Sequence, residues 1–114
     1  MPPVAVRQHV KKFERLLARL LPVSQVLPFD VEMPYPTEIN GEKMSTYIDW
    51  MKSCYYISTI GHPALSVPGA FTKSGLPAGV QIVGRHLDDR GVLQLGFAFE
   101  QATRHWKRHP ALAL

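Results

Sequence analysis

The chain has 114 residues, of which 46% are hydrophobic and 19% are charged, and its formal net charge is +4. This length suits one modest domain, and the composition excludes a disordered or low-complexity chain. The sequence has no apolar run of membrane-spanning length, no secretory signal and a single cysteine. These features predict a cytoplasmic protein with no membrane partner and no internal disulfide. The basic balance permits nucleic acid as a partner but does not require it.

An amphipathic helix is predicted over residues 4–21, because apolar side chains recur there at helical spacing. Pro22 should end this helix. A basic stripe on the opposite face consists of Arg7, Lys11, Arg15 and Arg19. The stripe is either a solvated face or a contact for phosphates or an acidic partner, and the solvated face is the simpler interpretation.

Prolines recur through residues 22–44, which predicts an extended and turning segment, with residues 23–27 as a possible short strand. Asn40-Gly41 is a turn signal within it. A helix is predicted next, over residues 45–60, with Ser45 as its N-cap. Gly61 is a natural stop for that helix.

Two apolar runs on either side of a polar break predict an antiparallel strand pair within residues 64–84. Gly75 supplies the positive φ that a tight reversal needs. Pro68 cannot donate to a ladder, so it marks a bulge or the end of pairing. Neither run alternates cleanly between apolar and polar residues, so at least one strand should be covered on both faces.

The last predicted helix spans residues 89–107, and Asp88 or Asp89 can cap it. Gly96 would allow this helix to pack closely on the sheet. Leu93 and Phe97 lie off its main apolar stripe, which indicates contact with a second surface.

We expect no metal and no cofactor. His105 and His109 have the spacing of two ligands on one helix face, but no third ligand is indicated. His86 with Asp88 and Asp89 is a short cluster in which the acids are better explained as helix caps. Phosphate-loop and dinucleotide-binding motifs are absent from the sequence. Cys54 can serve as a nucleophile only with a nearby base and a depressed pKa, and a core role is simpler.

Two stretches, Gly61-His-Pro-Ala-Leu-Ser-Val-Pro68 and Gly75-Leu-Pro-Ala-Gly-Val-Gln-Ile-Val-Gly-Arg85, closely resemble the C-terminal part of amidase-signature hydrolases. The strong match covers residues 61–103, and a weaker one extends back to Leu21-Pro22. The family usually has Ser-Val-Pro-x-Gly-Phe, whereas here the glycine comes one place early, at Gly69. The resemblance implies an α/β fold: a fragment of the mixed-sheet amidase fold in which a strand pair packs with about three helices. Residues 1–114 would form a single C-terminal segment of an amidase domain.

The same resemblance implies hydrolysis of an amide C–N bond by a serine nucleophile, a second serine with a cis peptide, and a lysine. Members of the family carry these groups in an earlier, Gly/Ser-rich portion, which has no counterpart in this sequence. We therefore assign no catalytic residue here. The candidates for a substrate-pocket wall are Tyr35, Tyr47, Asp49 and Trp50. Amidotransferase relatives hold a substrate amino group with an acid on a similar helix, which makes Asp49 a candidate. Core packing of the aromatic residues and a helix-dipole role for Asp49 are the simpler alternatives.

The leading hypothesis is thus that the chain is the C-terminal portion of an amidase-signature hydrolase and is inactive alone. It would complete the sheet and the pocket wall of a catalytic N-terminal portion, either in cis or in trans. Such a chain would be a truncated gene product, a separate subunit or an expressed fragment, and it should self-associate. Its small-molecule amide substrate would bind only in the complete enzyme. The alternatives are a small non-catalytic basic interaction domain, associated with nucleic acid through residues 7–19 and 104–108, and a thiol enzyme that uses Cys54. Steep weakening by salt would distinguish polyanion binding from apolar docking.

Overall fold

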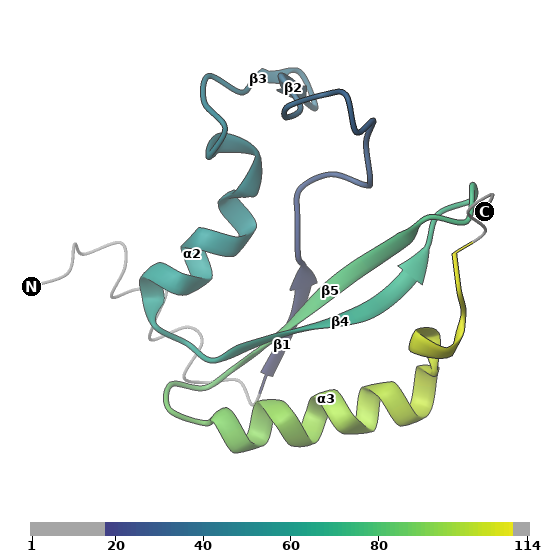
Figure 1. Cartoon of the computed structure of the whole chain (residues 1–114). Coiled ribbons are helices and arrows are strands. Elements are labelled where there is room, and N and C mark those ends of the chain that lie inside the picture. The colour runs from purple at the N-terminus through teal and green to yellow at the C-terminus, as the bar shows by residue number, and fades with distance from the viewer. Residues whose placement is uncertain (1–17, 111–114) are drawn as a thin grey trace, which may run out of the picture.

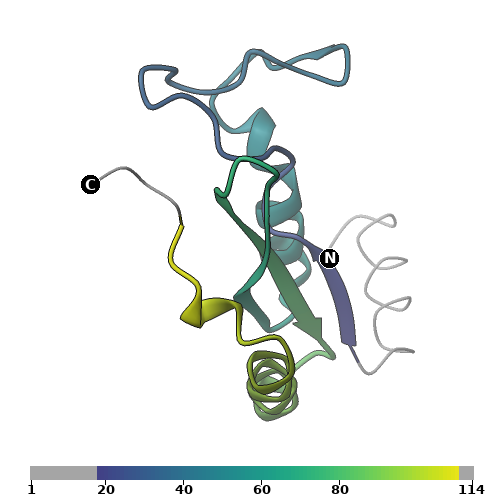
Figure 2. The ribbon, with the colours of Figure 1, turned by 90° about the vertical axis from the view of Figure 1, so that its right-hand side faces the viewer.

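A computed structural model describes residues 18–110 of the chain (Figure 1). Three strands form an antiparallel sheet of order β1-β5-β4. Helix α3 lies along this sheet, and both ribbon views place a small β2–β3 hairpin at the opposite end of the molecule (Figures 1 and 2). The α/β class is confirmed. In chain order the elements are β1 Ala18–Pro22, β2 Glu38–Ile39, β3 Glu42–Lys43, the 3₁₀ turn η1 Asp49–Met51, α2 Lys52–Ile60, β4 Ala64–Phe71, β5 Pro77–Gly84, α3 Asp89–Thr103 and the 3₁₀ turn η2 His105–Lys107.

Strand β1 corrects the end of the helix predicted over residues 4–21. Its residues pair with β5 from Ala18 opposite Gly84 to Pro22 opposite Val80. The sheet ladder satisfies backbone groups that a helix would otherwise pair internally, so tertiary pairing overrides the local helical periodicity. The strand expected at residues 23–27 is likewise wrong, because the chain bends there. Residues 4–17, with most of the basic stripe, lie outside the described residues.

The predicted strand pair is confirmed, and it contains the bulge that Pro68 indicated. The register between β4 and β5 shifts between Pro68 and Ala70. Gly75 has φ +85° in the turn between the two strands. Adjacent residues Ile82 and Val83 are both fully buried. Since neighbouring side chains of a strand point to opposite faces, the end of β5 is covered on both sides, as expected.

Helix α2 begins at Lys52, seven residues after the predicted N-cap Ser45. The Asp49 carboxylate accepts hydrogen bonds from the backbone N–H groups of Ser45 and Thr46, each at 2.9 Å, which holds this stretch in turns. The Lys52 N–H instead donates to the side-chain oxygen of Gln25, far back in the sequence. The early helix start was therefore wrong, whereas the predicted stop at Gly61, with φ +69°, is confirmed.

Helix α3 begins after Asp88, whose carboxylate accepts a hydrogen bond from the Gly91 N–H at 3.1 Å. The helix ends at Thr103, because Arg104 adopts a left-handed conformation with φ +51°. The predicted end at residue 107 was therefore too late, and His105 does not share a continuous helix with His109. Gly96 is buried, and a Cβ atom there would overlap the Leu65 side chain. The close helix–sheet packing expected at this glycine is confirmed.

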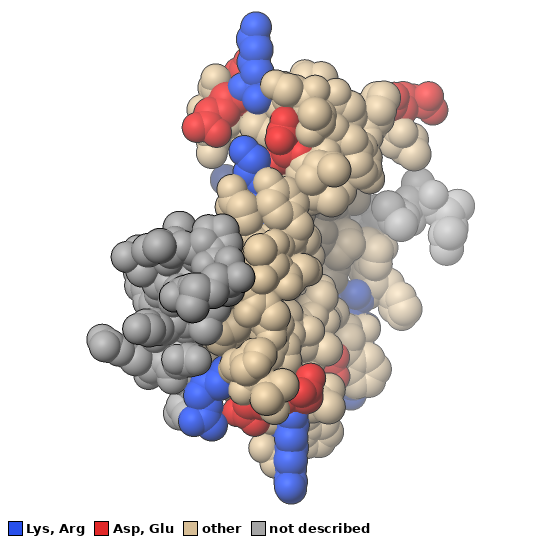
Figure 3. Space-filling model, turned by 90° about the vertical axis from the view of Figure 1, so that its left-hand side faces the viewer, with Lys and Arg blue, Asp and Glu red and all other residues tan. Residues whose placement is uncertain are grey.

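Few large apolar side chains of the described residues are fully covered by the chain itself. The buried hydrophobic residues are Met44, Ile57, Val67, Ile82, Val83 and Val92. Leu93 and Phe97 on α3 are 61% and 66% exposed. Figure 3 shows one face with charged side chains mostly toward its two ends and uncharged ones between them. No helix within residues 18–110 is long and apolar enough to cross a membrane.

Candidate functional site

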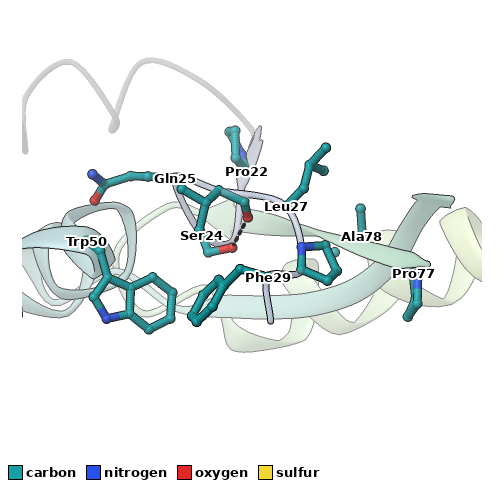
Figure 4. Close-up of a pocket in the computed structure, with 11 residues that line it drawn as sticks. Pro22, Ser24, Gln25, Leu27, Phe29, Trp50, Pro77 and Ala78 are labelled. Carbon is teal, nitrogen blue, oxygen red and sulfur yellow. Dashed lines mark hydrogen bonds between the residues drawn. The ribbon is translucent and has the colours of Figure 1, made fainter. Parts of the chain in front are cut away.

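A cavity of about 480 Å³ opens where the segment after β1, the η1 turn and the start of β5 meet (Figure 4). Segments far apart in the sequence thus share one wall. The lining residues are Pro22, Ser24, Gln25, Val26, Leu27, Pro28, Phe29, Trp50, Pro77, Ala78 and Gly79. A volume of this size lies in the range of small-molecule sites.

Partly buried hydrogen bonds hold the segments behind this wall together. The Gln81 side-chain amide is 6% exposed and donates to the carbonyl oxygens of Pro22 at 2.9 Å and of Ser53 at 3.0 Å. The Ser53 hydroxyl and the Cys54 thiol both donate to the Val23 carbonyl oxygen, at 2.7 Å and 2.8 Å. These bonds join β5, the end of β1 and the start of α2. The first residues of the cavity wall, Pro22 and Val23, are therefore bonded to both β5 and α2. Cys54 thus makes a structural contact, but from a half-buried position and not from the fully buried core position expected of it.

The cavity wall is predominantly apolar. Among its described lining residues none carries a charged side chain. Ser24 and Gln25 have polar side chains that are bonded to the protein's own backbone, whereas the buried indole N–H of Trp50 has no hydrogen-bond partner among residues 18–110. The Ser24 hydroxyl donates to the Val26 carbonyl oxygen at 2.9 Å (dashed line in Figure 4), and the side-chain oxygen of Gln25 accepts the Lys52 N–H. The wall therefore favours apolar groups over ions.

Aromatic rings run in a continuous edge-to-face series away from this cavity. Trp50 lies with its ring centroid 5.5 Å from that of Phe29 and 5.9 Å from that of Tyr47. Tyr47 in turn lies 5.9 Å from Tyr35. The structure thus brings together three of the residues proposed from the sequence, of which Trp50 lines the cavity. Phe29 also lines it and was not proposed, although its place in an apolar, Pro-rich segment was a usable signal.

The fourth proposed residue, Asp49, does not line this cavity. Its carboxylate accepts the N–H groups of Ser45 and Thr46 within its own turn. The hydrogen bond from the Thr46 backbone holds the pKa of Asp49 below its ordinary value, although partial desolvation acts in the opposite direction. A carboxylate engaged in this way stabilises the turn before α2.

The histidines of the loops on either side of the strand pair form no metal centre. His62 is 6% exposed, and its Nδ1 lies 2.8 Å from the Gly84 carbonyl oxygen. His86 Nδ1 lies 3.1 Å from the Gly61 carbonyl oxygen, so each ring ties one loop to the other. Asp88 is used as the cap of α3 and in an ion pair of 3.3 Å with Arg85. Across the described residues no group of three His, Cys, Asp or Glu side chains could hold a metal ion.

The C-terminal cations also lie near aromatic rings. The Lys107 ammonium is 5.3 Å from the Trp106 ring centroid, and the Arg108 guanidinium is 4.3 Å from that of Phe71. These cation–π contacts hold both side chains against aromatic rings.

A family model described as Amidase matches residues 3–93 of the chain. The chain belongs to the amidase-signature family. In solved structures it resembles a bacterial aryl acylamidase of the amidase signature enzymes, with a TM-score of 0.76 and 31% identity over 90% of this chain. That match covers only 21% of the acylamidase chain.

The curated relatives that it matches include subunits A of glutamyl-tRNA(Gln) amidotransferases. The protein of Thermodesulfovibrio yellowstonii is 38% identical over 69% of this chain, and that of Alkaliphilus metalliredigens is 32% identical over 88% of it. The protein of Methanosarcina barkeri is 42% identical over 71%. The chain spans 17%, 19% and 18% of these relatives, respectively. It therefore corresponds to about a fifth of a longer amidase-family protein.

Proposed function

We propose that this chain forms one wall of the substrate pocket in an amidase-signature hydrolase and completes the sheet of that enzyme. The observation that carries this proposal is the apolar cavity between residues 22–29, Trp50 and the start of β5. Its walls come from three separated segments that partly buried hydrogen bonds hold together. Such a preformed concave surface is the usual character of a small-molecule site.

The reaction is hydrolysis of an amide, and the catalytic groups come from outside this chain. Amidase-signature enzymes use a serine, a second serine and a lysine, and no motif in the 114 residues supplies them. The match to about a fifth of each relative supports a division of labour, in which another portion carries the chemistry in cis or in trans. The described residues then contribute substrate binding and the final strands of the sheet.

The test is reconstitution with the aryl acylamidase whose structure the chain resembles. That enzyme is produced without the segment that this chain matches, and the full 114-residue chain is added in trans. We expect no hydrolysis of acetanilide by either component alone and measurable hydrolysis by the mixture. A stable complex that remains inactive would overturn the proposal. So would turnover by the purified chain alone, accompanied by labelling of one defined serine with a serine-directed probe.

A further inference from the structure

The cavity lacks the groups that would be needed to hold a charged substrate. None of its described lining residues is Lys, Arg, His, Asp or Glu. The Ser24 and Gln25 side chains use their oxygen atoms in hydrogen bonds to the chain's own backbone. The third polar group of the lining, the buried indole N–H of Trp50, has no hydrogen-bond partner in the described part of the chain but is a neutral donor that cannot balance a charge. An ion moved from water into such a wall loses hydration and finds no opposite charge to replace it.

The nearby carboxylate of Asp49 does not supply the missing opposite charge. Asp49 directly precedes Trp50 in the sequence but does not line the cavity. Its carboxylate accepts two backbone N–H groups in its own turn, which fixes it there. A substrate ammonium group inside the cavity would therefore meet no carboxylate among the described lining residues, and contact with the aromatic rings, worth about 0.5–1 kcal/mol at an exposed site, would only partly offset its loss of hydration.

The apolar surfaces instead suit a ring. Phe29 and Trp50 meet edge to face at an interplanar angle of 88°, and an aromatic guest gains from the same geometry. Leu27, Pro28 and Ala78 add aliphatic contacts. An apolar cavity of about 150 Å³ is enough to hold benzene, so a cavity of about 480 Å³ has room for a ring with its amide group.

We propose that this cavity takes the uncharged aryl or branched-alkyl part of the amide and discriminates against a charged group at the same position. This inference rests on the proposed function and adds its substrate class. The selectivity arises from desolvation: the charged analogue binds more weakly because its ion is stripped of water without compensation. Zwitterionic amides such as free L-glutamine are disfavoured for the same reason.

The test measures binding to the complex of the full chain with the truncated acylamidase by isothermal titration calorimetry, because the chain supplies only one wall of the pocket. The probes are acetanilide, 4-acetamidobenzoate, which adds one carboxylate to the same ring, and L-glutamine. We expect acetanilide to bind at least about tenfold more tightly than either charged probe. Equal or tighter binding of a charged probe, or no binding of acetanilide, would overturn the inference.

Two variants test whether the cavity wall itself sets the preference for acetanilide over 4-acetamidobenzoate. Leu27→Lys places a cation in the cavity wall at a side chain that is 61% exposed, so the fold should tolerate it. It should reduce the preference for acetanilide over 4-acetamidobenzoate about tenfold. Val31→Lys makes the same charge change at a 93% exposed side chain outside the cavity, and it should leave the ratio unchanged. Equal effects of the two variants would show that long-range charge sets the ratio and would contradict the inference.

The failure of this inference can be told apart from failure of the proposed function. Loss of charge selectivity in an active reconstituted enzyme would refute the substrate class alone. Selective binding by a reconstituted complex that remains inactive would refute the chain's role in the hydrolase and leave the cavity's preference intact.

Discussion

The side-chain nitrogen of Gln81 lies 2.9 Å from the carbonyl oxygen of Pro22, at a separation of 59 residues in the sequence. The same nitrogen donates to the Ser53 carbonyl oxygen at 3.0 Å. One buried amide thus connects the middle of the sheet, the start of the cavity wall and α2. This contact anchors the start of the cavity wall to the sheet and to α2.

Replacing Gln81 with leucine should therefore destabilise the chain. The change removes the two partly buried hydrogen bonds to the Pro22 and Ser53 carbonyl oxygens, which together contribute about 1–3 kcal/mol to the free energy of unfolding. Urea denaturation followed by circular dichroism measures the loss. Gln94→Leu is the matched control, because Gln94 lies on the exposed side of α3. Equal stability of Gln81→Leu and the original chain would show that these hydrogen bonds contribute nothing net.

Because Gly96 lies against Leu65, we predict that replacing this glycine with alanine destabilises the chain, although alanine has the higher helix propensity. Alanine is favoured over glycine in a helix by about 1 kcal/mol, yet a Cβ atom at residue 96 would overlap the Leu65 side chain. We expect Gly96→Ala to destabilise the chain by about 1–3 kcal/mol. Leu65→Ala should relieve that overlap, so a double-mutant cycle should give a favourable coupling energy. A stabilising Gly96→Ala substitution would contradict the close packing of α3 on β4.

Asp49 should make stability depend on pH in the acid range. Backbone hydrogen bonds lower its pKa in the folded chain, so the ionised form is favoured by folding. The stabilisation is present above the unfolded-state pKa near pH 4 and is lost as the pH falls through the folded-state value. The stability difference between the original chain and Asp49→Asn should therefore shrink below about pH 4. Urea midpoints measured at several acid pH values test this, and parallel curves for the two proteins would refute it.

The exposed apolar side chains predict that the purified chain does not remain a simple monomer. Leu93 and Phe97 lie on α3 with most of their surface uncovered, and Leu27 and Tyr47 are exposed on the segment between β1 and α2. Apolar surface of this extent is unusual on monomers. Analytical ultracentrifugation should show self-association in moderate salt, and replacing both Leu93 and Phe97 with glutamine should weaken it. A single monomeric species that binds no dye for apolar surfaces would contradict this expectation.

Much of the fold follows from local sequence signals. Gly61 and Gly75 supply left-handed conformations where the chain must turn, Pro68 lacks the donor that a regular ladder needs, and Asp88 caps a helix. Each feature depends on the chemistry of one residue and its neighbours, so each could be predicted from the sequence.

The errors occurred where distant residues decide the local structure. Leu20 and Leu21 continue a helical pattern but belong to a strand, because β5 pairs with them. Likewise, the first N–H group of α2, that of Lys52, is paired with the side chain of Gln25, which is 27 residues away in the sequence. Such long-range competition cannot be read from a window of local sequence. Tyr35, Tyr47 and Trp50 were chosen by residue type and do meet, while the participation of Phe29 depends on the path of the Pro-rich segment.

The most direct test of the central claim is the kinetics of acetanilide hydrolysis by the reconstituted enzyme carrying Phe29→Ala. Phe29 lines the cavity and meets Trp50, so its loss should raise KM about tenfold, which corresponds to the aromatic surface removed. Val31→Ala, two residues away and 93% exposed, is the matched control and should leave KM unchanged. If the chain forms a wall of the substrate pocket, KM should rise tenfold for Phe29→Ala and stay unchanged for Val31→Ala. Unchanged kinetics for Phe29→Ala in an active complex would contradict that role.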